Sequence, residues 1–359
     1  MSTLRPHSQV LALATFLLGC GQNASEPSLS FRPVSEVTAL AVASDGSVIA
    51  GTGADGVFRS SDDGQSWSHV LPDPPRRVFD GGLAAAPSGY VFAATLRGLG
   101  CRGDPLQCFS EEILFRSQNN GETWEPVPVE GLYSPVARLA ADSKGGVFGT
   151  YIYAGGIARS PDNGTTWTHV TSFEGWVPSL FYSAPFVSLA VSSSDLVWAA
   201  SESCIQCVWR LADNAEHFIQ VFTGLEGMGR VVTGPGGNVL LADILGSEVA
   251  HSSDEGVTWR NTRFTTSSPI RTLAMAPDGH ILVVTDSGIY RASTVDYAWT
   301  QLTANLAPER PYAQISALVI KPDGTIFAGV NAGEAGLVFR SRDGGTTWTR
   351  IDLMVPLRP

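Results

Sequence analysis

The sequence contains almost no lysine, because Lys144 and Lys321 are the only two among its 359 residues. Lysine and arginine together number 23 against 34 acidic residues, and the formal net charge is −11. This balance argues against a general nucleic-acid-binding protein, which would need a basic stripe along one face. A long hydrophobic run is also missing, since the apolar stretch from Val10 to Gly19 is too short to cross a bilayer as a helix.

Glycine and proline, in contrast, are plentiful at 38 and 22 residues, which predicts many turns and short elements. The motif S-x-D-x-G-x-(S/T)-W recurs in four intact copies, at 60–67, 160–167, 252–259 and 341–348. A fifth copy at 117–124 has asparagine in place of aspartate, and two eroded copies cover 211–218 and 292–299. The marker residues of the five well-kept copies are Asp62, Trp67, Asn119, Trp124, Asp162, Trp167, Asp254, Trp259, Asp343 and Trp348.

A second repeat, independent of the motif, has the same count of seven. In each unit an aliphatic residue stands five positions before a turn, namely Leu40, Leu83, Leu139, Leu189, Val231, Leu273 and Leu318. Another β-rich run follows the turn, a third leads into the motif and a fourth starts at its tryptophan. Four short strands per unit of about 40–50 residues predict an all-β chain, a seven-bladed β-propeller of four-stranded blades. We expect the blades at 37–70, 78–127, 136–170, 186–222, 230–262, 270–302 and 315–353.

The pattern leaves the closure of the ring open, because two segments fit the fourth strand of the last blade. Leu29 to Val34 is one, and Trp348 to Leu353 is the other. We favour the carboxy-terminal segment, with Leu29 to Val34 packed nearby or serving as a linker.

The repeated motif resembles the Asp-box, or BNR repeat, of sialidases, sortilins and photosystem II assembly factors. The resemblance implies that the aspartate accepts backbone N–H groups inside a tight turn, that the glycine adopts an unusual backbone angle, and that the tryptophan packs between sheets. The alternative is a ring of carboxylates that binds metal. We prefer the structural role, because each aspartate serves its own turn and two units lack the box, and we expect no metal and no cofactor.

The amino terminus has the features of an export signal at residues 1–19, with Arg5 before the apolar run. The run ends in Leu17-Leu18-Gly19-Cys20, which resembles the bacterial lipobox. The resemblance implies that Cys20 carries a lipid and that the protein lies at the bacterial cell envelope, with residues 20–36 as a tether. The alternative is an ordinary signal peptide with a chance cysteine. The lipid would be the only membrane contact.

The other four cysteines form two close pairs, Cys101 with Cys108 and Cys204 with Cys207. Both pairs lie at the connection between the second and third strands of a unit. In an exported protein they predict two local disulfides. Zinc binding by all four is the alternative, although a whole blade separates the two loops.

A ligand of a propeller usually docks over the central channel, on the face with the loops that connect the blades. Arg138 and Arg230 stand one residue before the aliphatic marker in their units, and Arg271 stands two before it. Arginines near several first strands could form a cradle for an anion, or simply pair between blades. The candidate ligand-binding residues are Arg77, Arg138, Trp176, Arg230, Arg271 and Tyr312.

Two functions follow from these features. The first is a monomeric, non-catalytic propeller that binds a protein or glycan, which resembles the photosystem II assembly factors in having seven blades and no hydrolase centre. The second is an exo-sialidase or other glycoside hydrolase, with Glu309, Arg310 and Tyr312 as the candidate cluster. Sialidases have six blades and an F-R-I-P motif, whereas this chain has Phe31-Arg32-Pro33-Val34, so we prefer the binder.

Overall fold

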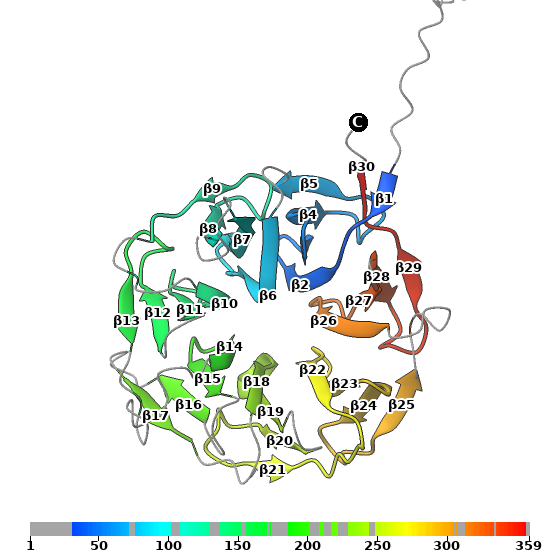
Figure 1. Cartoon of the computed structure of the whole chain (residues 1–359). Coiled ribbons are helices and arrows are strands. Elements are labelled where there is room, and N and C mark those ends of the chain that lie inside the picture. The colour runs from blue at the N-terminus through cyan, green and yellow to red at the C-terminus, as the bar shows by residue number, and fades with distance from the viewer. Residues whose placement is uncertain are drawn as a thin grey trace, which may run out of the picture.

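The computed structural model describes residues 31–71, 76–101, 108–129, 132, 136–151, 156–170, 173, 186–201, 208–211, 217–221, 229–243, 248–303, 306, 313–333 and 335–356. For 97–101, 108–112, 186, 187, 303 and 356 only the backbone is described. Seven four-stranded antiparallel sheets stand around a central axis, which confirms the predicted seven-bladed β-propeller (Figure 1). Among the described residues, no helix is long and apolar enough to cross a membrane.

The four strands of each blade follow one another in the sequence. Blades 1 to 4 consist of β2 (Val37–Val42), β3 (Val48–Thr52), β4 (Val57–Ser60) and β5 (Ser68–Leu71); β6 (Arg76–Ala85), β7 (Val91–Cys101), β8 (Cys108–Ser117) and β9 (Glu125–Pro126); β10 (Val136–Ala141), β11 (Val147–Tyr151), β12 (Ile157–Ser160) and β13 (Thr168–Val170); and β14 (Phe186–Val191), β15 (Val197–Ser201), β16 (Val208–Leu211) and β17 (Phe218–Gln220).

Blades 5 to 7 repeat this order, with one 3-10 turn, η2 (Pro235–Gly237), between the first two strands of blade 5. They consist of β18 (Gly229–Thr233), β19 (Val239–Asp243), β20 (Val249–Ser252) and β21 (Arg260–Asn261); β22 (Ile270–Met275), β23 (His280–Thr285), β24 (Gly288–Ser293) and β25 (Thr300–Thr303); and β26 (Gln314–Ile320), β27 (Ile326–Ala332), β28 (Ala335–Ser341) and β29 (Thr349–Ile351).

The hydrophobic core lies between the blades. The second strands β3, β11 and β15 are buried along their whole length, because a neighbouring blade covers each face of the sheet. Ile49 of blade 1, for example, belongs to the same buried cluster as Val78 and Val91 of blade 2. Burial of such a side chain contributes about 1.5–3 kcal/mol. These second strands are therefore mainly apolar along their whole length in the sequence.

The aspartate of the repeated motif organises the turn between the third and fourth strands. In blade 1, Asp62 Oδ1 accepts the Ser66 amide at 2.9 Å and the Ser60 hydroxyl at 2.8 Å. Asp62 Oδ2 accepts the Ser66 hydroxyl at 2.6 Å. These hydrogen bonds, that from the Ser66 hydroxyl first, lower the pKa of Asp62 to about 2. In blade 2, Asn119 Oδ1 accepts the equivalent amide of Thr123 at 3.0 Å, so an amide performs the same task.

The motif glycine packs against the preceding blade, and the motif tryptophan closes its own turn with a hydrogen bond. Gly256 has a φ of +79°, and a Cβ there would lie 2.2 Å from the ring of Trp198 in blade 4, so only glycine fits. The indole Nε1 of the motif tryptophan donates to the carbonyl oxygen of the motif glycine in Trp124–Gly121 (3.0 Å), Trp167–Gly164 (3.1 Å), Trp259–Gly256 (3.1 Å) and Trp348–Gly345 (2.8 Å).

An arginine at the end of the third strand links each of several blades to the next. Its guanidinium donates to the carbonyl oxygen of the positive-φ residue that precedes the next motif glycine. The pairs are Arg340–Asp63 (2.6 Å), Arg59–Asn120 (2.9 Å) and Arg116–Asn163 (2.8 Å). The first pair joins blade 7 to blade 1 and so contributes to the closure of the ring.

The carboxy-terminal strand β29 completes the last blade, and the amino-terminal segment pairs outside the ring. β1 (Phe31–Pro33) and β30 (Met354–Pro356) form a separate two-stranded antiparallel sheet at the rim (Figure 1). Arg32 of β1 pairs with the buried Asp55 of blade 1 at 2.5 Å. Burial raises the pKa of Asp55, but the hydrogen bonds from Arg32 and the Ser35 amide outweigh it and hold this pKa below its usual value.

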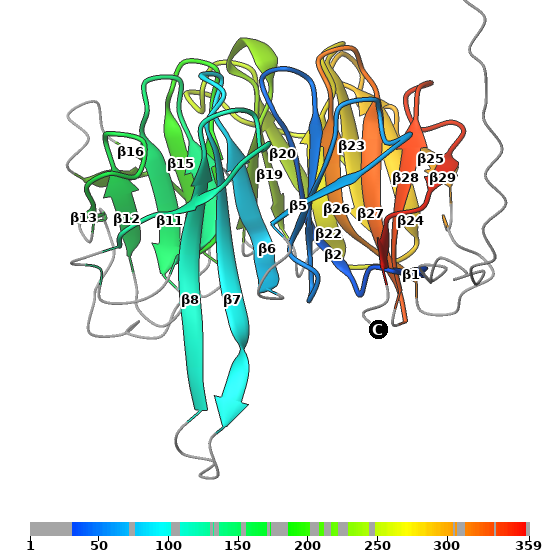
Figure 2. The same cartoon turned by 90° about the horizontal axis from the view of Figure 1, so that it is seen from above.

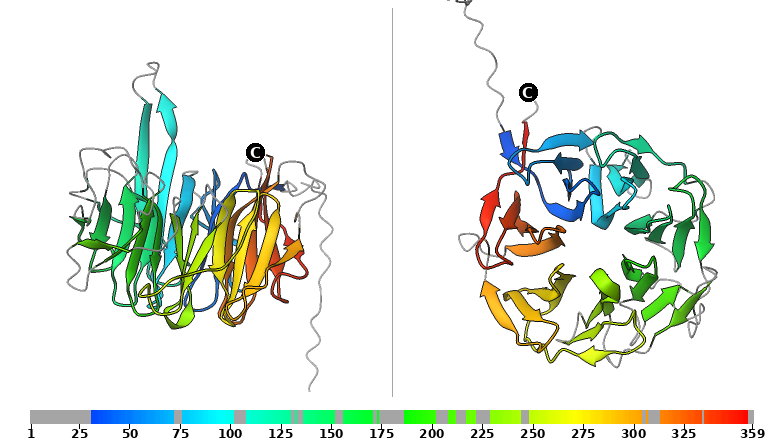
Figure 3. Two further views of the ribbon diagram at one scale, coloured as in Figure 1. Left: turned by 90° about the horizontal axis from the view of Figure 1, so that it is seen from below. Right: turned by 180° about the vertical axis from the view of Figure 1, so that it is seen from behind.

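Strands β7 and β8 extend beyond the ring as a two-stranded arm (Figures 2 and 3). Their pairing continues outward to Cys101 opposite Cys108, while β6 accompanies β7 only as far as Arg97. The arm projects from the face opposite the motif turns, because it prolongs the connection between the second and third strands. The described part of the chain contains no disulfide. The side chains of Cys101, Cys108, Cys204 and Cys207 lie outside that part.

Candidate functional site

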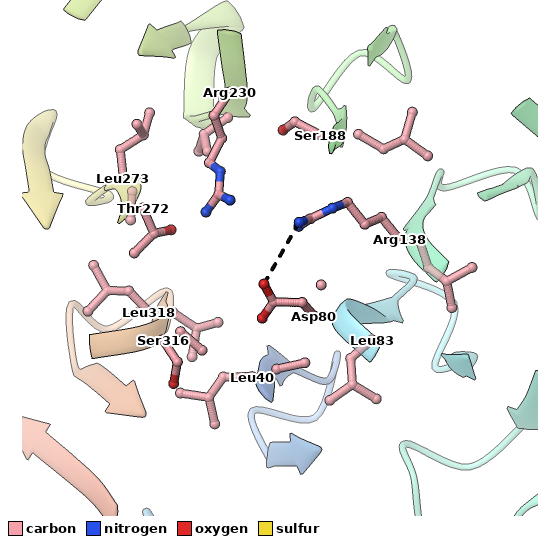
Figure 4. A pocket seen from close by; sticks show the side chains of 18 of the residues that line it. Leu40, Asp80, Leu83, Arg138, Ser188, Arg230, Thr272, Leu273, Ser316 and Leu318 are labelled. Carbon is pink, nitrogen blue, oxygen red and sulfur yellow. Dashed lines mark ion pairs between the residues drawn. The ribbon is translucent and has the colours of Figure 1, made fainter. Parts of the chain in front are cut away.

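A cavity of about 420 Å³ occupies the centre of the ring, where the first strands of the blades converge. Most of the residues that line it are aliphatic, with Leu40, Leu83, Leu273 and Leu318 among the side chains drawn in Figure 4. Its charged lining residues are Asp80, Arg138 and Arg230. We call these three residues the channel mouth, because Arg138 and Arg230 stand near the starts of β10 and β18. These starts lie on the same face of the ring as the arm.

The backbone of the first strands explains how these side chains enter the channel. In β6 the pairing with β7 jumps from Val78 to Leu83, so that a bulge of several residues carries Asp80 inward. The bulge needs Gly82, because a Cβ there would lie 2.8–3.1 Å from three carbonyl oxygens, including that of Ala137 in the next blade. A smaller shift in β10, between Val136 and Leu139, accompanies the inward position of Arg138.

The three charged groups of the channel mouth come from three different blades. Arg138 Nη2 of blade 3 lies 3.8 Å from Asp80 Oδ2 of blade 2, beyond hydrogen-bond distance (Figure 4). The Arg138 side chain is 23% exposed and that of Asp80 is 60% exposed. Arg230 of blade 5 points into the same space and donates one N–H to the carbonyl oxygen of Arg271. Two guanidinium groups therefore share the cavity with one carboxylate.

Uncharged polar side chains near the channel join neighbouring first strands. Ser188 Oγ of blade 4 donates to the Val231 carbonyl at 2.9 Å and accepts the Val231 amide at 3.1 Å. Ser316 Oγ of blade 7 donates to the carbonyl of Val37 in blade 1 at 2.5 Å. These bonds satisfy backbone groups at inner strand edges, which would otherwise remain unpaired.

The structure brings together two of the predicted ligand-binding residues, Arg138 and Arg230, in one cavity. Arg271 does not line this cavity. Its guanidinium binds both carboxylate oxygens of Asp286, at 2.6 and 2.8 Å, which holds the pKa of Arg271 above its usual value. Arg77 is exposed on β6 and does not line the cavity either. Trp176, Glu309, Arg310, Tyr312, Cys20, Cys204 and Cys207 lie outside the described residues.

Sequence reasoning missed Asp80, the carboxylate of the channel mouth. The only signal was an acidic residue before two glycines, Asp80-Gly81-Gly82, just ahead of the aliphatic marker Leu83. Gly81 has a φ of +66°, which is typical of a bulge. In the part of the chain that the structure describes, no group of three or more His, Cys, Asp or Glu side chains could hold a metal ion.

No protein-family model matches the chain, and a search of curated proteins finds no match either. Solved structures share its fold. The chain is similar to the GH74 xyloglucanase from Xanthomonas campestris, with a TM-score of 0.69 and 16% identity over 90% of this chain and 56% of that one. It therefore spans little more than half the length of that enzyme.

Two further structures align over nearly their whole length. YCF48 bound to D1 peptide gives a TM-score of 0.59 at 13% identity, covering 93% of this chain and 98% of that chain. Virginiamycin B lyase from Staphylococcus aureus gives a TM-score of 0.62 at 12% identity, covering 87% and 98%. At such low identities the likeness shows the β-propeller fold alone, and these neighbours include both enzymes and a protein bound to a peptide.

Proposed function

We propose that this protein is an exported, lipid-anchored and non-catalytic β-propeller that binds a protein or glycan partner at the bacterial cell envelope. The observation that carries the proposal is the convergence of Arg138 and Arg230 in one cavity of a protein with a formal charge of −11. Their guanidinium groups suit a carboxylate or another planar anion, which can accept two parallel N–H bonds.

A protein partner is supported by the structure of YCF48, a propeller similar to this chain that is bound to a D1 peptide. The arm formed by β7 and β8 stands on the same face as the channel mouth, so a partner at the mouth would lie beside it (Figure 2). We further propose that the repeated motifs are Asp-boxes with a structural role. The turn geometry around Asp62 and Asn119 supports this interpretation.

The anchor and the disulfides belong to the same proposal. Cys20 would hold the lipid, and residues up to Glu36 would connect it to blade 1. The register of the arm supports the first disulfide, because Cys101 and Cys108 are directly opposite one another in the antiparallel ladder. The second bond would join Cys204 to Cys207, and both bonds suit an oxidising compartment.

The alternative, a glycoside hydrolase, has the fold of the xyloglucanase in its favour. Most glycoside hydrolases other than sialidases, whose nucleophile is a tyrosine, need two carboxylic acids, one on either side of the scissile bond. Among the described residues that line the central cavity, Asp80 is the one acidic side chain. A hydrolase would have to take its second carboxylate from elsewhere, for example from Glu309, which makes the non-catalytic function the better supported of the two.

A labelled hexaglutamate peptide provides a direct probe of the channel mouth. We expect Arg138→Gln to weaken its binding about tenfold, because one charge-assisted pair is lost, and we expect binding to weaken as salt rises. The matched control is Arg77→Gln, which removes the same charge from an exposed position outside the cavity. Equal affinities of the two variants, or equal binding of a hexaglutamine peptide, would contradict the proposal.

A further inference from the structure

A second groove lies between blades 6 and 7, on the face that carries the motif turns. Its larger part is a cavity of about 530 Å³, between the turn at Pro277-Asp278, the turn at Pro322-Asp323 and the motif of blade 7, with Leu282 and Ile326 beneath. A smaller cavity of about 340 Å³ shares His280 and Arg291 with it and continues toward Asp296. We call the two together the blade 6–7 groove.

The groove exists because Gly344 has no side chain. At the same motif position in three other blades, a side chain reaches the turn of the preceding blade. Asp63 pairs with Lys321 at 2.5 Å, Asn120 accepts the Ser44 hydroxyl at 2.8 Å, and Glu255 accepts the hydroxyl of Ser194. In blade 7 that space stays open. A Cβ on Gly344 would lie 2.6 Å from Arg291 Nη1, so the glycine also makes room for this guanidinium.

Arg291 occupies the strand position at which Arg59, Arg116 and Arg340 bind the next blade. Those three arginines donate to a backbone carbonyl, as described above. Arg291 makes no hydrogen bond within the described part of the chain, and its nearest acidic partner is Asp278 Oδ2 at 3.6 Å. Its side chain is only 24% exposed. A largely buried guanidinium whose N–H groups bind no other described residue is well suited to bind a carboxylate in bidentate fashion.

The other charges of the groove select among anionic ligands. Asp278, Asp323 and Asp343 line it together with Arg291 and Arg342. Three carboxylates disfavour a doubly charged phosphate or a run of acidic residues, because like charges repel at close range. Asp343 is engaged on both oxygens by its own turn. Asp278 and Asp323 each accept one backbone amide, from His280 and Thr325, and Asp278 Oδ2 also lies 2.9 Å from His280 Nδ1. Both carboxylates are more than half exposed, at 58% and 56%, so they can accept further hydrogen bonds. Neutral hydroxyl groups supply such bonds without a charge penalty.

We propose that the blade 6–7 groove binds an acidic oligosaccharide, in which the carboxylate of a uronic acid pairs with Arg291 and neighbouring hydroxyls donate to Asp278 and Asp323. The two joined cavities provide room for more than one sugar ring. This site lies on the opposite face from the channel mouth and shares no charged residue with it, so the two proposals stand or fall separately.

Isothermal titration of the intact chain, kept in detergent, with digalacturonate tests this proposal. Wild type should bind digalacturonate with a dissociation constant in roughly the millimolar range. Arg291→Gln should weaken binding about tenfold or more. Gly344→Asn should do the same, because it introduces the residue of blades 2 and 3 and displaces Arg291, while asparagine tolerates the positive φ of +69°. Arg350→Gln removes a charge at an exposed position outside the groove and should leave binding unchanged.

Each contrary result overturns the proposal. Failure of wild type to bind digalacturonate, or undiminished binding by Arg291→Gln, would remove the carboxylate site. Equal binding of the neutral disaccharide of galactose would show that Arg291 does not recognise the carboxylate. Equal, Arg291-dependent binding of a diglutamate peptide would overturn the assignment to sugars. Unchanged thermal melting of both variants is required for a loss of binding to support the proposal, and Arg138→Gln should leave this binding intact.

Discussion

Arg340 Nη1 of the last blade donates to the backbone carbonyl oxygen of Asp63 in the first blade at 2.6 Å, and the Asp63 carboxylate in turn accepts Lys321 at 2.5 Å and Arg342 at 3.0 Å. One residue thus receives three cationic side chains from across the closure of the ring. The hydrogen bond from Lys321, ahead of the opposing effect of burial, holds the pKa of Asp63 below its usual value.

Asp63→Ala should therefore destabilise the ring at its closure. We expect the lost pair to lower the free energy of unfolding by about 1 kcal/mol, since water partly screens it but Lys321, 13% exposed, loses its shortest partner. Alanine also adopts the positive φ of +58° less readily than aspartate, which adds to the loss at every pH. Because the folded pKa of Asp63 lies below its ordinary value of 3.8, the contribution of Asp63 is fully present above that value and is lost as the pH falls through the lowered pKa. Urea denaturation measures the change. The control is Asp352→Ala, which removes a surface pair with Arg350. An equal loss of unfolding free energy in this variant would contradict a special role of Asp63 in the closure of the ring.

The motif aspartate should tolerate asparagine but not alanine. Asp162 Oδ1 accepts the Thr166 amide and Oδ2 accepts the Thr166 hydroxyl, both at 2.8 Å. Blade 2 already uses Asn119 for this turn, so Asp162→Asn should cost little, whereas Asp162→Ala should lower the free energy of unfolding by about 1 kcal/mol. The comparison of the two melting curves is the measurement. If both variants were equally destabilised, the turn would depend on charge and not on the acceptor oxygen.

A neutral histidine should make the junction of blades 5 and 6 sensitive to acid. His251 is buried, its Nδ1 accepts Tyr297 Oη–H at 2.8 Å and its Nε2–H donates to Asn238 Oδ1 at 2.7 Å. Burial first, and then the charge of Arg260, lower the pKa of His251 below 6.5, although Asp254 opposes the shift. The unfolded chain therefore takes up the proton more readily, and stability should decline as the pH falls through 6.5 toward the folded pKa.

His251→Gln removes this titration. Its free energy of unfolding should change less between pH 7.5 and pH 5.5 than that of wild type, whatever the absolute stability of the variant. Denaturant titrations at both pH values provide the comparison. If the free energy of unfolding had the same pH dependence in the two proteins, protonation of His251 would not be what destabilises this junction.

The architecture was predictable from the sequence because each blade repeats the same local chemistry. The acceptor at Asp62, the glycine at Gly64 and the burial of strands such as β3 depend on neighbours within a unit or in the next one. The inward position of Arg138 and Arg230 was also predictable, since residues in one frame of equivalent first strands point the same way.

The remainder of the site depends on features that a repeat pattern does not encode. Asp80 enters the channel through a bulge, and a bulge changes the frame locally. Arg271 shares a first strand with residues that line the channel, yet Asp286 binds its guanidinium. The sequence offered two strands for the last blade, and the pairing of β1 with β30 became visible only with the ends of the chain placed together.

Mapping the contact of an anionic peptide shows directly whether the channel mouth is the binding site. A hexaglutamate peptide with a photoreactive group at one end should cross-link to residues around the channel mouth, such as Ser188, Thr272 and Ser316, which line the same cavity as Arg138 and Arg230. Arg138→Gln should reduce these cross-links by about tenfold at a fixed low probe concentration. Cross-links confined to the motif face, or channel cross-links of wild-type yield in Arg138→Gln, would contradict the assignment of the channel mouth as the binding site.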